Sequence, residues 1–289
     1  TDLIVGPFFE KPYKQVSDFS KSNQIQAVCP VSQSNKLLFN NPFVTELKTS
    51  FPTQTSYLAS YIAQNKNTEN VICVSGKSKQ EKYLANLFSE KFEKALKGKS
   101  DNFRPKANSF NLTSYSSMKG FDLKLIKGKK NVIILPLIEK GMASSFFTQL
   151  NIILSKSRMK GYEVEVFALE NLLEYDEIET SYKMKYNLHV TASSFIDYKE
   201  EKVKNFVKQY RAKFGTEPSK FAFLGFDAAF FHAVGLNSFG KNFSDHYDQI
   251  QVPLLQSNFQ LERSDKNSGF ENQSVFILVY KDFELIKVN

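Results

Sequence analysis

Histidine, cysteine and serine build most catalytic and metal sites, and this chain carries few of them in a useful pattern. His189, His232 and His246 have no metal-ligand spacing with cysteine or carboxylate residues. Neither H-E-x-x-H nor G-x-S-x-G occurs in the sequence. We therefore expect no metal, no cofactor and no covalent chemistry.

The segment Ser75-Gly76-Lys77-Ser78 is the closest approach to a phosphate loop. A P-loop requires G-x-x-x-x-G-K-[ST], but Val71 occupies the place of the first glycine. A strand–glycine–helix junction can still bind an anion through backbone N–H groups. The alternative is a plain turn, and the sequence leaves both open.

Cys29 and Cys73 each lie in a short apolar run. Buried free cysteine, acting as a small hydrophobic residue, is the simpler interpretation. A disulfide is not indicated, so the redox compartment stays open.

The totals exclude two classes of protein. The 289 residues are 42 % apolar and carry a net charge of +8, but the lysines are spread along predicted helices without the basic stripe of a nucleic-acid-binding protein. No run reaches the ~18 apolar residues of a membrane span. The chain begins at Thr1 without a signal peptide, which suggests that upstream residues were removed.

Apolar strands alternate with amphipathic helices through most of the chain. The predicted strands are 2–5, 25–29, 43–47, 70–75, 107–112, 131–135, 162–169 and 188–192. The predicted helices begin at Pro12 and Thr53 or cover 80–96, 117–126, 141–157 and 199–214. This alternation predicts an α/β fold with parallel sheets flanked by helices on both faces. The tail, 259–289, reads instead as antiparallel strands with a hairpin turn at Lys281-Asp282.

One helix is apolar almost all round. It follows the turn Gly215-Thr216-Glu217-Pro218, with Ser219 as its expected cap, and should be buried on most sides. Asp227 interrupts it, and a charge in such a helix must be paired or hydrogen-bonded. We favour a structural partner for Asp227.

Several ordered segments together resemble the type I periplasmic binding proteins, the Leu/Ile/Val-receptor-like family. They are Ile4-Val5-Gly6-Pro7, Pro30-Val31-Ser32, Asn41-Pro42-Phe43, Ser50-Phe51-Pro52-Thr53-Gln54, Glu217-Pro218 and Gly225-Phe226-Asp227-Ala228. The resemblance implies two lobes joined by three crossovers, with a ligand in the cleft between them. Lobe one would be 1–52 and 192–258, and lobe two 53–191 and 259–289. The family's first strand–helix–strand has no counterpart here, so the sheet of lobe one should be incomplete.

Ligands of open parallel sheets lie beyond the carboxyl ends of the strands. The candidate ligand-binding residues at these ends are Phe8, Ser32, Gln33, Lys77, Leu137, Glu170 and Asn171. By resemblance, Ser32 falls where the family binds an α-carboxylate and Glu170 where it binds an ammonium group. Glu170 could also be a solvated loop residue, and Phe8 could fill the core. Pro7-Phe8-Phe9 replaces the serine-rich first loop, and no stacking tyrosine follows strand 70–75, so the amino-acid site is not carried over intact.

The resemblance implies a non-catalytic binding protein like the substrate-binding components of ABC transporters. Its ligand would be a small molecule, such as an amino acid or a cell-wall fragment, in the periplasm or cell envelope, and membrane association would need an upstream anchor or a partner. The altered first loop favours an alternative: an interaction or regulatory module that has lost its ligand and binds an envelope protein. An enzyme without a recognisable motif is a third hypothesis.

Overall fold

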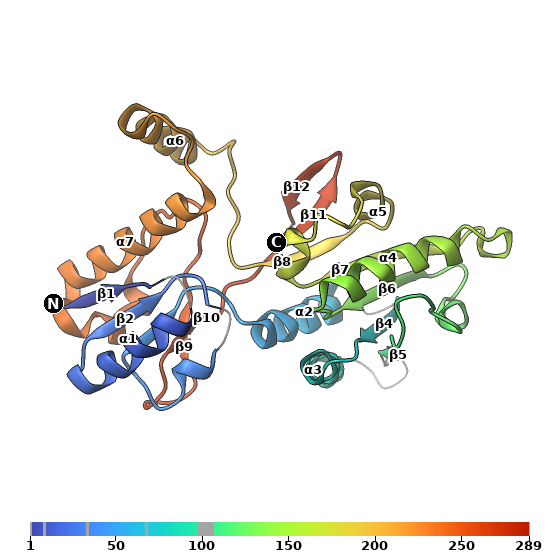
Figure 1. The fold of residues 1–289 in the computed structure, drawn as a ribbon, viewed down its shortest axis with the longest axis horizontal. Helices are drawn as coiled ribbons and strands as arrows, with labels where there is room; N and C mark the ends of the chain where they lie inside the picture. Colours follow the sequence, from blue (N-terminus) through green and yellow to red (C-terminus); the bar gives the residue numbers. More distant parts are fainter. Residues whose placement is uncertain (1, 8–9, 33–34, 67–68, 97–106, 289) are drawn as a thin grey trace. The chain divides into compact units, whose positions relative to one another are not determined.

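The computed structural model describes residues 2–7, 10–32, 35–66, 69–96 and 107–288, and the chain forms two compact α/β units (Figure 1). Unit 1 comprises Thr1–Ser50 and Ser193–Val275, and unit 2 comprises Phe51–Ala192 and Phe276–Asn289. The chain therefore passes from one unit to the other after Ser50, after Ala192 and after Val275.

Unit 1 contains a five-stranded sheet in the order β1-β2-β3-β10-β9. Its strands are β1 (Leu3–Val5), β2 (Gln26–Cys29), β3 (Val44–Glu46), β10 (Phe270–Asn272) and β9 (Leu261–Arg263). The first four run parallel, and β9 pairs antiparallel with β10.

Helices cover both faces of this sheet because successive strand residues point to opposite sides. From α1 (Glu10–Asn23), Tyr13 packs in one cluster with Ala27 and Cys29. From α7 (Lys220–Phe239), Phe231 packs in another cluster with Val28. The remaining helix of this group, α6 (Glu201–Phe214), packs on α7.

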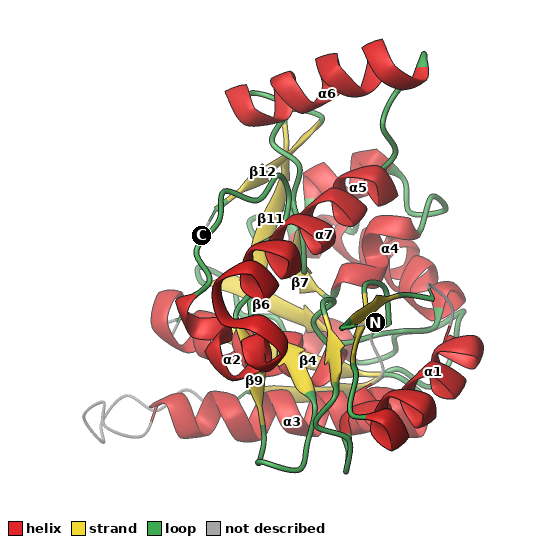
Figure 2. Cartoon of the chain, turned by 90° about the vertical axis from the view of Figure 1, so that its left-hand side faces the viewer, coloured by secondary structure: helices red, strands yellow, loops and turns green. Residues whose placement is uncertain are grey.

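Unit 2 contains a seven-stranded sheet in the order β12-β11-β8-β7-β6-β4-β5. Its strands are β12 (Glu284–Lys287), β11 (Phe276–Lys281), β8 (His189–Ala192), β7 (Glu163–Ala168), β6 (Lys130–Leu135), β4 (Asn70–Ser75) and β5 (Asn108–Asn111). The five strands from β8 to β5 run parallel, whereas β11 pairs antiparallel with β8 and β12. Its helices, shown in red in Figure 2, are α2 (Phe51–Asn65), α3 (Lys79–Leu96), α4 (Lys140–Leu154) and α5 (Thr180–Lys185).

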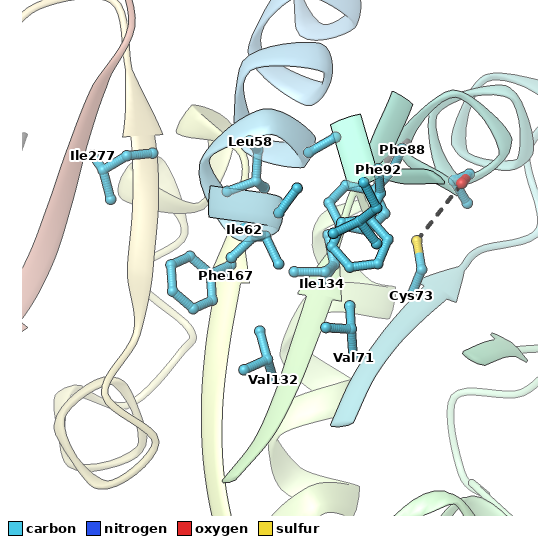
Figure 3. Packing of buried hydrophobic residues seen from close by; sticks show 14 residues of the cluster. Leu58, Ile62, Val71, Cys73, Phe88, Phe92, Val132, Ile134, Phe167 and Ile277 are labelled. Atoms are coloured by element: carbon cyan, nitrogen blue, oxygen red, sulfur yellow. Dashed lines mark hydrogen bonds between the residues drawn. The ribbon is translucent and has the colours of Figure 1, made fainter. Parts of the chain in front are cut away.

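The core of unit 2 lies between α2, α3 and one face of the sheet (Figure 3). Phe88 and Phe92 of α3 stack with ring centroids 5.7 Å apart, and Val132 and Ile134 of β6 lie in the same cluster. The alternate residue Ile133 is also fully buried, on the opposite face. Burial on both faces explains why these parallel strands read as continuous apolar runs. The two mostly parallel sheets with their helices confirm the predicted α/β fold.

Two local predictions were wrong. The helix predicted over 117–126 is only a 3-10 turn, Phe121–Lys124, because Gly120 before it takes a left-handed conformation with φ of 81°. The last hairpin turns one residue later than predicted, at Asp282 and Phe283, whose φ angles are both positive.

The first part of the tail also differs from the prediction. We expected all of 259–289 in lobe two, but β9 and β10 belong to the sheet of unit 1. The reason is pairing: β10 runs parallel to β3, and the Asn272 amide donates to the Leu47 carbonyl oxygen at 3.0 Å. Only β11 and β12 join unit 2.

The apolar helix α7 is buried on one face only, so its expected burial on most sides is wrong. Phe223 and Phe231 are buried, but Phe221, Phe226 and Phe230 are exposed. The structural partner expected for its buried Asp227 is confirmed. The carboxylate accepts hydrogen bonds from three consecutive backbone N–H groups, those of Leu255, Gln256 and Ser257, at 2.7 to 3.0 Å. Ser219 precedes the helix, but its hydroxyl makes no capping hydrogen bond within the described residues.

Candidate functional site

Loops after four neighbouring strands meet at the carboxyl edge of the unit 2 sheet. The strands lie in the order β7-β6-β4-β5 and run parallel, so their carboxyl ends share one edge. The loops that follow them carry Lys77, Leu137, Glu170 and Asn171, which are the predicted site residues of this unit.

A buried carboxylate, Glu81, holds two of these loops together. It accepts hydrogen bonds from the backbone N–H groups of Ile138 and Glu139, both at 2.9 Å, and from the backbone and hydroxyl of Ser78. Burial alone would raise its pKa, but these donors together lower the pKa below its usual value. The Ser78 N–H at the strand–glycine–helix junction is thus bound by the chain's own carboxylate, which favours a turn over an external anion site.

Gly76 is required at this junction by close approach. A Cβ atom there would lie 2.3 Å from Glu81 Oε2 and 3.0 Å from the Leu137 side chain. Only glycine leaves room for the carboxylate to reach the loop after β6.

The loop after β6 is also tied to the loop after β7. The Asn171 amide donates to the Leu137 carbonyl oxygen at 2.8 Å and to the Tyr175 hydroxyl at 2.9 Å. The Tyr175 hydroxyl in turn donates to the Ile138 carbonyl oxygen. Leu137 therefore offers its backbone to this network, while its side chain is fully buried.

Glu170 is positioned by a residue far away in sequence. The Gln54 amide of α2 donates to Glu170 Oε2 at 3.0 Å, and Gln54 Oε1 accepts from the Glu170 backbone N–H at 3.3 Å. Thr191 of β8 fixes Gln54 by donating to the same Oε1 at 2.6 Å. Glu170 is half-buried and oriented, which does not fit a freely solvated loop residue.

An aromatic residue reaches this edge from a loop that sequence reasoning did not consider. The Lys77 ammonium lies 4.7 Å from the centroid of the Tyr115 ring, and the Tyr115 hydroxyl donates to Glu139. Tyr115 follows β5, whereas the stacking tyrosine of the resemblance would follow β4. In the sequence, the only feature that could have pointed to Tyr115 was its position in a polar loop between predicted strands.

The corresponding edge of unit 1 carries Ser32, which is buried in the loop after β2. Beside β3, the Ser50 backbone N–H donates to a Glu271 oxygen at 3.0 Å, and the Thr49 hydroxyl donates to the Ser274 carbonyl oxygen at 2.7 Å. The other two predicted site residues, Phe8 and Gln33, lie outside the described residues.

The described residues contain no group of three histidine, cysteine or acidic side chains that could hold a metal ion. Cys29 and Cys73 are both buried and neither is part of a disulfide, as the simpler interpretation predicted. Burial raises the pKa of the Cys73 thiol to about 12, so this thiol is a poor nucleophile. Within the described part of the chain, no helix has the length and apolar character needed to cross a membrane.

Comparisons with known proteins identify the fold but no close relative. No family model matches the chain, and no curated protein matches it significantly. Solved structures, in contrast, match this chain over almost its whole length.

An ABC transporter substrate-binding protein from Desulfitobacterium hafniense, in complex with Leu, superposes with a TM-score of 0.66 at 14 % identity, covering 99 % of this chain and 80 % of that one. A putative branched-chain amino acid ABC transporter protein from Rhodospirillum rubrum superposes with a TM-score of 0.70 at 11 % identity. The match covers 100 % of this chain and 80 % of that one. A solute-binding protein from R. palustris, in complex with benzoate, superposes with a TM-score of 0.56 at 11 % identity. The match covers 100 % of this chain and 77 % of that one. The chain therefore has the α/β fold of the periplasmic solute-binding proteins of ABC transporters.

Proposed function

We propose that this chain is a non-catalytic solute-binding protein that binds a small organic molecule through the loops at the carboxyl ends of its strands. The observation that carries the proposal is the polar edge of unit 2. There, Glu81, Asn171 and Tyr175 link the loops after β4, β6 and β7 into one network, beside the oriented carboxylate of Glu170. Such pre-organisation reduces the entropy lost when a ligand binds.

The chemistry of the edge suggests the ligand class. Glu170 supplies a half-buried carboxylate that could accept from an ammonium group, and Tyr115 supplies a partly exposed aromatic ring. Proteins of this fold bind Leu and benzoate according to their descriptions. We infer an amino acid or a small organic acid as the ligand.

The fold also supports a cellular location and a partner for the protein. Proteins with this fold are described as periplasmic and as parts of ABC transporters. We infer a periplasmic or envelope location and delivery of the ligand to a membrane transporter.

Isothermal titration against a defined panel tests the proposal. The panel contains leucine, isoleucine, benzoate, 3,4-dihydroxybenzoate and soluble cell-wall fragments. We expect at least one member to bind. If that member is an amino acid, Glu170→Gln should weaken its binding at least tenfold, because the amide cannot balance an ammonium charge. Glu90→Gln, an exposed change on α3, should leave binding unaltered.

Thermal unfolding of the same variants separates folding from binding. Glutamine can keep the hydrogen bonds with Gln54, so Glu170→Gln should unfold within a few degrees of the wild type. If no panel member binds, the proposal fails and the alternative of an interaction module is favoured. If an amino acid binds equally well to Glu170→Gln, the assignment of Glu170 is wrong.

A further inference from the structure

Most of the positive charge of the chain lies at the amino edge of the unit 2 sheet, opposite the edge of the candidate ligand site. Residues 119–130 lead into β6, and residues 152–163 connect the end of α4 to β7. Because β6 and β7 are parallel neighbours, both segments lie at one end of the sheet (Figure 1). Together they contain eight basic and two acidic side chains, so they account for six of the eight net positive charges.

A buried asparagine ties the lysine-rich turn before β6 to the start of β7. The Asn131 amide donates to the carbonyl oxygens of Lys129 at 3.2 Å and of Glu163 at 2.9 Å. Its side-chain oxygen accepts from the Ile126 backbone N–H at 2.8 Å. The main chain at Ile126 and Lys129 is therefore fixed beside the first residue of β7.

Two side-chain contacts also join the segments. The guanidinium of Arg158, in the turn after α4, forms an ion pair with Asp122. Lys127 lies against Gly161, since a Cβ atom placed there would be 3.4 Å from the lysine Cε. Lysines from two segments that are distant in sequence therefore share one surface.

The charge of these lysines is largely uncompensated. Five of them are exposed and form no ion pair with any residue that the structure describes: Lys124, Lys127, Lys129, Lys156 and Lys160. Asp122 is already paired with Arg158. Glu69 reaches the same edge, where its carboxylate accepts from the Lys130 backbone N–H at 3.2 Å. The carboxylates at this edge are too few to neutralise it.

Two aliphatic side chains are exposed among the lysines. Leu123 is 85 % exposed and Ile126 is 44 % exposed. Phe121 and Leu125 of the same turn are buried, so they anchor it in unit 2 while Leu123 stays in solvent. We call Leu123, Ile126 and the five exposed lysines the amino-edge patch.

We propose that the amino-edge patch docks on the surface of an anionic phospholipid bilayer. The lysines would contact anionic headgroups, while Leu123 and Ile126 would enter the boundary between headgroups and acyl chains. Clusters of several basic residues next to exposed apolar side chains are typical of surfaces that bind anionic lipid. Docking through this edge would leave the opposite, carboxyl edge of the sheet free for a ligand.

Two other anionic partners fit the patch less well. A nucleic-acid-binding surface usually combines arginine with exposed aromatic side chains, but the single arginine of these segments is paired with Asp122. An acidic protein would match the charge, but lysine is depleted in protein–protein interfaces. Lysine with exposed aliphatic side chains therefore favours the bilayer.

Co-sedimentation of the full chain with vesicles tests this docking surface. One vesicle preparation is pure phosphatidylcholine, and the other contains about 30 mol % phosphatidylglycerol, which gives its surface a negative potential. The wild type should bind the second preparation and bind the first much more weakly. It should dissociate from the second preparation at high salt, because surface charges are then screened.

Two variants separate the contributions of charge and of apolar insertion. Lys127→Gln/Lys160→Gln should weaken binding roughly 30-fold, from about fivefold for each lysine near an anionic surface. Leu123→Ser should weaken it at least about tenfold, because burial of the leucine side chain is lost.

The matched controls lie in the same unit. Lys82→Gln/Lys94→Gln on α3 removes the same charge from other exposed positions, and Phe283→Ser changes an apolar side chain that is 80 % exposed. Each control should stay within about twofold of the wild type. All variants change exposed side chains, and circular dichroism confirms that each is folded before vesicles are added.

Four results would overturn the proposal. The first is no sedimentation of the wild type with phosphatidylglycerol vesicles. The second is an equal loss in the patch and control lysine variants, since net charge alone would then explain binding. The third is unchanged binding of Leu123→Ser, because the turn would then not enter the bilayer. The fourth is binding to poly-glutamate or duplex DNA without binding to vesicles, which would indicate an acidic protein or a nucleic acid instead.

Discussion

Among single residues, His232 illustrates how burial sets the pH response of unit 1. Its ring is completely buried, with Nδ1 2.7 Å from the Ala228 carbonyl oxygen and Nε2 3.4 Å from the Tyr247 hydroxyl. Burial lowers its pKa to about 4, although the hydrogen bond to Ala228 acts in the opposite direction. The folded protein therefore holds this side chain neutral under conditions where the unfolded chain takes up a proton.

Acid should destabilise the protein through His232 in a defined window. The unfolded histidine titrates near 6.5, so the unfolded state gains a proton first as pH falls. Stability should be unaffected above about pH 6.5 and fall between pH 6.5 and 4, by up to about 3 kcal/mol from this group. Urea unfolding of wild type and His232→Gln checks this expectation. Between pH 6.5 and 4, the free energy of unfolding should fall less steeply for the variant than for the wild type. Parallel curves of free energy against pH would contradict the assignment.

Glu81 is the residue on which the loops of unit 2 depend. The Glu81 carboxylate accepts hydrogen bonds from Ser78, Ile138 and Glu139. In Glu81→Gln, the amide NH₂ group would replace one accepting oxygen and would face these donors. We expect the free energy of unfolding to fall by roughly 2–4 kcal/mol. Chemical denaturation measures it, with Glu90→Gln on the exposed side of α3 as the control, expected within about 0.5 kcal/mol of wild type. Equal stability of both variants would mean that Glu81 does not hold the loops.

The sequence located some residues of the candidate site and missed others for a physical reason. Glu170 and Asn171 could be predicted because they directly follow an apolar strand, and strand ends mark ligand sites. Gln54, Glu81 and Tyr115 could not be assigned roles, since each acts on a partner 24 to 116 residues away. Such contacts follow from strand order, which hydrophobic periodicity does not determine.

At the scale of elements, buried parallel strands were the easiest to predict. Strands such as β4 and β6 are apolar on both faces and end at glycine or proline, so their runs are unambiguous. The predicted helix over 117–126 failed because Gly120 outweighs a weak periodic pattern. Strands β9 and β10 were found, but three-residue strands carry no signal for the sheet they join.

Two truncations test the role of the last strands in unit 2. Removing 276–289 deletes β11, whose Ile277, Leu278 and Val279 are buried against the sheet, and should cost more than the ~5–15 kcal/mol of a typical domain. Removing only 284–289 deletes β12, which is mostly exposed and pairs with β11 alone. We expect the first truncation to be insoluble or molten and the second to unfold cooperatively. A soluble first truncation with unchanged near-UV circular dichroism would contradict this view of β11.

For the whole molecule, the arrangement of the chain matters more than any single motif. Each unit is assembled from segments far apart in sequence, so the residues that support one strand edge are distributed over the chain. This organisation explains why no short motif predicts function, while the order of many weak segments predicts the fold. It also gives each unit its own carboxyl edge, with Ser32 in unit 1 and Glu170 in unit 2.

The central claim is that a small molecule binds the loops at the carboxyl edge of unit 2. Amide hydrogen exchange, measured with and without a saturating ligand from the titration panel, tests it most directly. We predict slower exchange in the loops after β4, β6 and β7 of unit 2, with no change at the exposed turn 264–267 between β9 and β10. Unchanged exchange in these loops, or protection only away from them, would contradict the account.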